Sequence, residues 1–114
     1  MPRTIERRYQ VERLCFLIEL HEGAEEEYQR RHDEIWPEMV GAVSAAGYTN
    51  YTLFRRGSTV IGYAECIPDI ASVMQKMNAA DVTPRWNESL EGVIKTLTDE
   101  SGNLLRAVEV WHLD

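Results

Sequence analysis

The sequence predicts an α+β domain in which an antiparallel sheet carries its helices on one face. The 114 residues, 44% hydrophobic and 27% charged, have the proportions of one soluble globular domain. Some segments alternate between apolar and polar residues, as strands do, and others have the apolar spacing of helices. The two kinds of segment follow one another along the chain. Their order is strand, helix, strand, strand, helix, strand. This is the split βαβ, or ferredoxin-like, arrangement.

The first strand is predicted at Glu12 to Leu20, in the segment ERLCFLIEL. Its side chains divide between two faces, with Leu14, Phe16, Ile18 and Leu20 on one and Cys15, Leu17 and Glu19 on the other. The preceding residues, 1–10, are polar and rich in arginine. We expect them to form a loose arm and residues 11–114 to form the single domain.

Helical spacing begins at Ala24 and continues to Ala46. One stripe of this helix carries Tyr28, His32, Ile35 and Met39. Pro37 should kink or restart the helix, because proline lacks the amide proton and disfavours the α conformation of the residue before it. Gly47 is well suited to end the second stretch in the left-handed conformation.

The second half of the chain begins with a predicted hairpin, in which Tyr48–Arg56 and Thr59–Cys66 flank a Gly57-Ser58 turn. A short helix should start at Pro68-Asp69 and extend through Met77.

Thr83 is the expected N-cap of the last helix, with Pro84 at its first position. The apolar face of this helix would carry Trp86, Leu90, Val93 and Leu97. After a Gly102-Asn103 turn, Leu104 to Leu113 would form the final strand.

Charge and hydropathy exclude several classes of function. Twelve Lys and Arg stand against nineteen Asp and Glu, and a net charge of −7 argues against a nucleic-acid surface. No apolar run approaches the roughly 20 residues that span a bilayer, and the first ten residues contain no apolar signal core. We therefore expect a cytoplasmic protein without membrane contact. Cys15 and Cys66 are then expected to be buried and reduced, although the sequence also allows them to pair.

The predicted strands are apolar on both faces, whereas the helices can cover only one of them. A second copy packed against the free face would remove it from water, so we expect a homodimer formed through the sheet face.

His32 is the first candidate for chemistry, because it shares a helical face with Tyr28 and its ordinary pKa of about 6.5 suits proton transfer. The commoner alternative, from spacing alone, is a partly buried histidine satisfied by a backbone carbonyl. His21 and His112 form no metal-binding pair with His32, so no metal site is expected.

Four aromatic residues form a second candidate group: Tyr28, Trp36, Tyr51 and Trp86. Aromatic faces with a few polar groups bind the apolar faces and hydroxyls of a sugar, although such residues more often fill a core. The neighbouring Arg30, Arg31 and Arg85 could bond substrate oxygens or could be solvated helix charges, which is the more common case.

The segment EEYQRRHDEIWPE, residues 26–38, resembles the signature of the L-rhamnose mutarotase family, E-Y-x-x-R-H-x-x-I-W-P-E. The similarity continues more thinly at Asn50-Tyr51, at Arg85-Trp86 and in the closing segment 109–113, and covers roughly residues 12 to 113.

The resemblance implies a small dimeric α+β barrel that interconverts the anomers of L-rhamnose without a cofactor. It places the family's acid histidine on His32 and its substrate-binding tyrosines on Tyr28 and Tyr51. The family's tryptophan pair falls on Trp86 and Asn87, so an amide replaces the second aromatic ring. Because that ring can pack the methyl group of a 6-deoxy sugar, L-fucose or another related aldose is an alternative substrate.

Mutarotation opens the hemiacetal by protonating the ring oxygen and removing the proton of the anomeric hydroxyl. We expect His32 to protonate the ring oxygen, Tyr28 to orient the sugar or assist the second transfer, Tyr51 to bind hydroxyls and Trp86 to stack on the sugar. Two alternatives share the fold: a cofactor-independent monooxygenase-like α+β barrel, and a binding module for small ligands without turnover.

Overall fold

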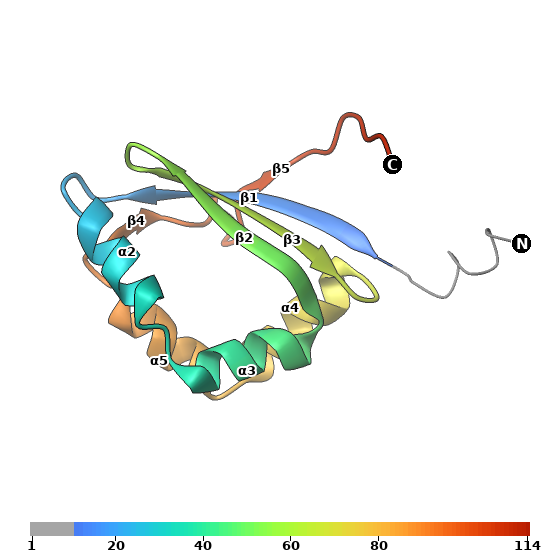
Figure 1. Ribbon diagram of the computed structural model, residues 1–114, viewed down its shortest axis with the longest axis horizontal. Helices are drawn as coiled ribbons and strands as arrows, with labels where there is room; N and C mark the ends of the chain where they lie inside the picture. Colours follow the sequence, from blue (N-terminus) through green and yellow to red (C-terminus); the bar gives the residue numbers. More distant parts are fainter. Residues whose placement is uncertain (1–10) are drawn as a thin grey trace, which may run out of the picture.

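The computed structural model describes residues 11–114, so the arm predicted at 1–10 lies outside the described residues. The elements, in chain order, are β1 (Glu12–Leu20), α2 (Glu25–Asp33), α3 (Pro37–Ala46), β2 (Tyr48–Arg56), β3 (Thr59–Cys66), α4 (Ile70–Ala79), α5 (Val82–Ser89), β4 (Ile94–Thr96) and β5 (Arg106–Ala107) (Figure 1). The predicted α+β order is confirmed. Each helical segment consists of two helices, and two short strands, β4 and β5, follow α5.

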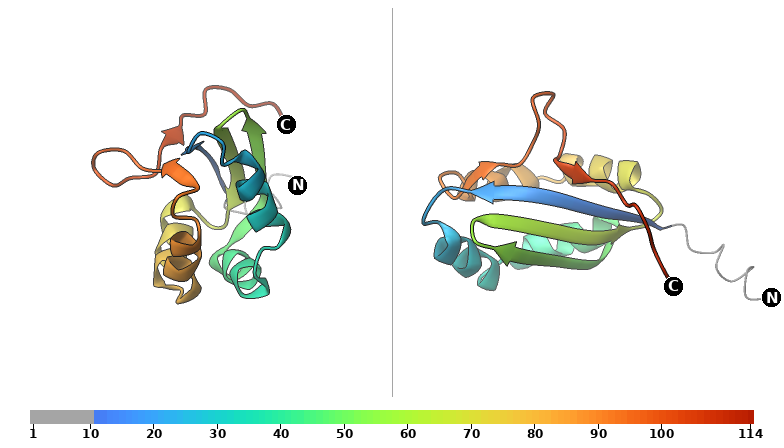
Figure 2. Two further views of the ribbon diagram at one scale, coloured as in Figure 1. Left: turned by 90° about the vertical axis from the view of Figure 1, so that its left-hand side faces the viewer. Right: turned by 90° about the horizontal axis from the view of Figure 1, so that it is seen from above.

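The strands form one antiparallel sheet in the order β2-β3-β1-β4, and β5 also pairs with β1. This is the strand order of the ferredoxin-like arrangement. All four helices lie on one face of the sheet, and no helix of residues 11–114 lies on the opposite face (Figures 1 and 2). The predicted one-sided layering is therefore confirmed.

The alternation predicted for β1 decides which side chains form the core. Leu14, Phe16, Ile18 and Leu20 are buried beneath the helices, with Val60 of β3 and Val73 of α4 fully enclosed among them. Leu17, on the opposite face, remains 38% exposed. The period of two in the sequence therefore separates the covered face of the sheet from the open one.

The predicted restart at Pro37 is also confirmed. Helix α2 ends at Asp33, and Trp36 has the extended backbone (φ −65°, ψ 134°) that a following proline favours. Gly47 ends α3 at φ 111°, and a Cβ atom there would overlap the carbonyl oxygen of Ile67. The entry into β2 therefore requires glycine both for its backbone angle and for the close approach.

Helix α4 begins as predicted, since the Asp69 carboxylate accepts a hydrogen bond of 2.7 Å from the amide of Ser72. The helix continues to Ala79, two residues beyond the predicted end.

The prediction for the last helix was wrong at both ends. Thr83 is not the N-cap, because α5 already begins at Val82, and its hydroxyl donates instead to the carbonyl of Met77 at 2.6 Å. The helix ends at Ser89, well before Leu97. Gly92 follows at a φ of 83°, and Ile94–Thr96 then pairs with β1 as the strand β4. The apolar spacing continued past this point, but the left-handed glycine and the β-branched residues after it favour a turn and a strand.

The final strand predicted at Leu104–Leu113 is reduced to Arg106–Ala107. Residues 108–114, all within the described part of the chain, form no strand, and Val110 and Trp111 are 91% and 76% exposed. Between β4 and β5 the chain makes a small loop, closed by the hydrogen bond from the Leu105 amide to the Leu97 carbonyl (3.1 Å). This loop extends away from the sheet (Figure 2).

The two cysteines are free, as expected, but only one of them is buried. Cys66 points into the core and is fully enclosed, whereas Cys15 lies half-exposed on the open face of the sheet. The expectation that Cys15 is buried was therefore wrong, because no described element covers that face. Over residues 11–114, no helix has the length and apolar character needed to cross a bilayer.

Candidate functional site

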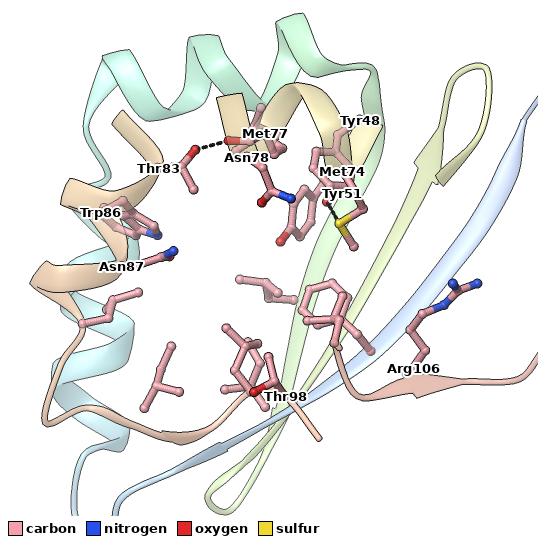
Figure 3. Close-up of a pocket in the computed structure, with 18 of the residues that line it drawn as sticks. Tyr48, Tyr51, Met74, Met77, Asn78, Thr83, Trp86, Asn87, Thr98 and Arg106 are labelled. Atoms are coloured by element: carbon pink, nitrogen blue, oxygen red, sulfur yellow. Dashed lines mark hydrogen bonds between the residues drawn. The ribbon is translucent and has the colours of Figure 1, made fainter. Parts of the chain in front are cut away.

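A cavity of about 820 Å³ lies between the sheet and the helices (Figure 3). Its volume falls within the range of small-molecule sites. Five of the predicted site residues line it, and they come from three separate elements: Tyr28 and His32 of α2, Tyr51 of β2, and Trp86 and Asn87 of α5. The fold therefore brings together residues that are up to 59 positions apart in the sequence.

His32 sits in the last turn of α2, where its Nδ1 atom lies 2.9 Å from the backbone carbonyl oxygen of Tyr28. A carbonyl oxygen can only accept, so Nδ1 carries a proton and donates it. The backbone-carbonyl interpretation of His32 is therefore correct, and it is compatible with the catalytic one. The bond fixes the ring and leaves Nε2 as the nitrogen that can exchange a proton with a ligand.

Two aromatic rings hold the imidazole of His32. The ring of Tyr28 lies 4.3 Å away between centroids, and the ring of Trp86 meets it edge-on at 5.5 Å. Burial raises the pKa of Tyr28 from 10 to about 12, because the ionised hydroxyl would lose its solvation. At neutral pH the Tyr28 hydroxyl is therefore a neutral group that can donate a hydrogen bond.

Helix α5 contributes Trp86 and Asn87, which project toward the cavity side by side (Figure 3). Trp86 is buried and presents an aromatic surface, whereas Asn87 is exposed and presents an amide. Trp36 does not line the cavity. It packs edge-on against Trp86 at 5.2 Å and supports that ring from the junction of α2 and α3.

Tyr51 enters the cavity from β2 next to Tyr48, with ring centroids 5.0 Å apart (Figure 3). Burial of the hydroxyl end raises the pKa of Tyr48 to about 12 and raises the pKa of Tyr51 as well. Both hydroxyls are therefore neutral at physiological pH and suited to hydrogen bonding with a polar ligand.

The arginines near the signature segment are occupied outside the cavity. Arg31 donates to the carboxylate of Glu27 and to the backbone carbonyl of Ser89, the last residue of α5. Arg30 pairs with Glu27 at 2.6 Å on the exposed side of α2. Arg31 therefore connects α2 to α5. It does not line the cavity, but it helps to hold together the two helices that do.

The third arginine, Arg85, pairs with Glu38 at 2.7 Å, and both side chains are more than half exposed. This pair joins α5 to the first turn of α3 across the surface.

Several cavity residues were missed in the sequence, among them Tyr48, Met74 and Asn78 (Figure 3). Tyr48 lies three residues before Tyr51, and on a regular strand the two would face opposite sides. Met74 and Asn78 lie one turn apart on α4. Their spacing places them on one face of a helix, but neither residue type by itself indicates a binding site. Within residues 11–114, no three His, Cys, Asp or Glu side chains gather as a metal site would require.

Fold and site together define a class: a ferredoxin-like α+β protein that holds one histidine among aromatic rings at the wall of a small-molecule cavity. The sequence model of the L-rhamnose mutarotase family matches residues 13–113, nearly the whole described chain. The chain belongs to the L-rhamnose mutarotase family.

Relatives agree over their full length. The L-rhamnose mutarotase of Lactiplantibacillus plantarum is 36% identical over 104 residues, which cover 90% of this chain and 98% of that protein. The L-rhamnose mutarotase of Bacillus subtilis is 33% identical over 104 residues, covering 91% of this chain and all of that protein.

Among solved structures, the crystal structure of an L-rhamnose mutarotase from Formosa agariphila superposes with a TM-score of 0.73 at 20% identity. The match covers 90% of this chain and 99% of that one, and it supports the fold.

Proposed function

We propose that this protein is a mutarotase that interconverts the α and β anomers of L-rhamnose. Family membership supports the reaction, and the placement of His32 against Tyr28 and Trp86 in the cavity supports the site most directly. The monooxygenase-like and binding-only alternatives share the fold but are not favoured by the relatives, which carry the mutarotase name.

His32 acts first in the proposed reaction. In its doubly protonated form, Nδ1–H stays bonded to the Tyr28 carbonyl and Nε2–H donates its proton to the ring oxygen of the sugar. The bond between the anomeric carbon and the ring oxygen then breaks. The anomeric hydroxyl gives up its proton, and the open chain carries an aldehyde. Rotation about the adjacent carbon–carbon bond and closure by the reverse steps give the other anomer and restore the imidazolium.

Tyr28 is better suited to orienting the sugar than to taking the second proton. With a pKa of about 12, its hydroxyl is neutral and a poor base at physiological pH. The proton of the anomeric hydroxyl passes in this scheme to solvent, since Asn87 is exposed at the wall of the cavity. Proton transfers alone complete the reaction, so it requires no cofactor.

The remaining site residues bind the sugar in this proposal. Tyr51 bonds hydroxyls, Trp86 stacks on a C–H face, and Asn87 offers an amide where a second aromatic ring would pack a methyl group. Trp36 and Arg31 support the site from outside the cavity, the first through Trp86 and the second through α5.

The working unit is proposed to be a homodimer in which the open faces of two sheets pack together. Phe54 is 58% exposed and Leu17 is 38% exposed on that face, and Phe54 pairs in register with the half-buried Ile61 of β3. Such apolar surface is normally covered by a partner. A cytoplasmic location stays a prediction, and two free thiols are typical of a reducing compartment.

Saturation-transfer NMR between the anomeric protons of L-rhamnose tests the function. The wild-type chain should accelerate exchange, and His32→Ala should lose at least about a hundredfold of that acceleration, the usual contribution of a positioned acid or base. His21→Ala is the matched control, because His21 is exposed at the end of β1 and outside the cavity. Unchanged exchange in a folded His32→Ala variant would refute the assignment of His32.

A further inference from the structure

Strand β2 departs from regular geometry at Asn50. Three steps along β2, from Thr49 to Thr52, correspond to only two steps along β3, so β2 contains one extra residue in a β-bulge. Asn50 has a φ of 47°, in the left-handed region. Asparagine enters this region more readily than other residues with a side chain, and β-branched residues almost never do.

The bulge decides which way two tyrosines point. Tyr48 and Tyr51 are an odd number of residues apart, so on a regular strand they would lie on opposite faces of the sheet. With the extra residue between them, both line the cavity with their ring centroids 5.0 Å apart. Tyr51 also meets the ring of Phe16, an inward residue of β1, edge-on at 6.2 Å.

The side chain of Asn50 is anchored on the neighbouring strand. Its amide nitrogen donates to the carboxylate of Glu65 at 2.7 Å, and the hydroxyl of Tyr63 donates to the other oxygen of that carboxylate at 2.8 Å. These two donors hold the pKa of Glu65 below its usual range, so the acceptor stays ionised at neutral pH. An ionised acceptor strengthens the bond that fixes the Asn50 side chain.

We propose that Asn50 is a positioning residue of the sugar site: its left-handed backbone maintains the bulge that directs Tyr51 into the cavity beside Tyr48, and its bond to Glu65 makes a smaller contribution. The inference rests on the proposed function in one respect, namely that Tyr51 contacts the sugar. The direction of the Tyr51 ring is a separate property and is measured separately.

Two substitutions separate backbone geometry from side-chain bonding. Asn50→Gly keeps the left-handed angle without strain, whereas Asn50→Val disfavours it and favours a regular strand. Thr49→Val is the matched control, since it places the same side chain at the neighbouring residue, which still pairs in register with Glu65 of β3. If Asn50→Val does not fold, Asn50→Ala can replace it, because alanine also disfavours the left-handed backbone but less strongly than valine.

The direct readout is the nuclear Overhauser effect between the rings of Tyr51 and Phe16. It should be lost in Asn50→Val and retained in Asn50→Gly and Thr49→Val. The dissociation constant of L-rhamnose, from NMR titration, should rise about tenfold in Asn50→Val and stay within about threefold in the other two. For anomer exchange, KM should follow the dissociation constant while kcat changes little, because His32 is untouched.

Retention of the ring contact and of sugar affinity in Asn50→Val would overturn the inference. Equal losses in Asn50→Gly and Asn50→Val would also overturn it, because the backbone angle would then not be the cause. Absence of anomer exchange in the wild-type chain would overturn the proposed function instead. The titration and the ring contact would still decide the role of Asn50, because neither requires turnover.

Discussion

The imidazole of His32 is bonded to the backbone carbonyl of Tyr28, one turn earlier on α2, at 2.9 Å. The bond uses the main chain of Tyr28, so it does not depend on the tyrosine side chain. Substituting Tyr28 by phenylalanine therefore removes only the hydroxyl, while the tautomer and the orientation of His32 are kept. The two residues can be tested independently although they lie in contact.

The buried hydroxyl of Tyr28 should make stability fall at alkaline pH. Below pH 10 the hydroxyl is protonated in both states, whereas between pH 10 and about 12 the unfolded chain loses the proton and the folded chain keeps it. The free energy of unfolding should thus decrease through this range, by about 2–3 kcal/mol from Tyr28 at the upper end. Urea unfolding at pH 8, 10 and 11 should show a shallower decrease for Tyr28→Phe. Equal decreases in both proteins would contradict the burial of the hydroxyl.

Arg31 and Arg30 are neighbours with different expected importance. Arg31→Ala removes the bond to the Ser89 carbonyl at the end of α5 and should lower the free energy of unfolding by about 1–2 kcal/mol. Arg30→Ala, which removes surface pairs only, should cost less than about 0.5 kcal/mol. Because α5 carries Trp86, sugar affinity should weaken in the Arg31 variant alone. Urea unfolding and NMR titration of both variants make the comparison, and equal effects would contradict it.

Gly62 should tolerate no side chain. A Cβ atom at this position of β3 would overlap the ring of Phe16, which lines the cavity and contacts Tyr51. Gly62→Ala should therefore destabilise the protein by about 1–3 kcal/mol and weaken sugar binding by displacing Phe16. Gly41→Ala is the control, because the space around Gly41 on α3 is open and alanine favours helix by about 1 kcal/mol. Thermal unfolding should shift in opposite directions for the two variants.

Asn87 should govern how strictly the site selects a 6-deoxy sugar. Its amide can bond a hydroxyl at carbon 6, whereas a tryptophan at this position would present an apolar wall to a methyl group. Asn87→Trp should raise the preference for L-rhamnose over its 6-hydroxy analogue L-mannose by about tenfold, the scale expected for one such group. Saturation-transfer rates across both sugars and L-fucose measure this. An unchanged ratio would place the sixth carbon elsewhere in the cavity.

Phe54 should control association of the chain. A charge placed on the open face of the sheet should prevent two such faces from packing, so Phe54→Lys should sediment as a monomer where the wild-type chain sediments as a dimer. Val40→Lys is the control, since Val40 is 49% exposed on α3, beneath the other face of the sheet. Sedimentation velocity over a concentration series distinguishes the species, and a dimeric Phe54→Lys would exclude the sheet face as the interface.

The sequence was sufficient wherever a local signal decided the structure. Pro37 specified the break between α2 and α3, and Asp69 specified the start of α4, because the physical cause lies within a few residues. The stripe that joins Tyr28 and His32 likewise follows from helical spacing alone.

Prediction failed where the outcome depended on a partner strand. The alternation of residues 104–113 is typical of a strand, but only Arg106 and Ala107 pair with β1. Tyr51 points inward because of a bulge, which is defined by the pairing of β2 with β3. The sequence of one strand does not show how it pairs with its neighbour, so the bulge could not be predicted from it.

In the part of the chain that the structure describes, the sheet has two edges, and neither presents a long regular strand. One edge is β4 and β5, five residues in all, separated by the loop around Gly102; the other is β2, interrupted at Asn50. Unbroken edge strands are templates to which other chains add their own strands, and short or bulged edges oppose this. The same irregularities that shape the cavity therefore also protect the protein against edge-to-edge aggregation at high concentration.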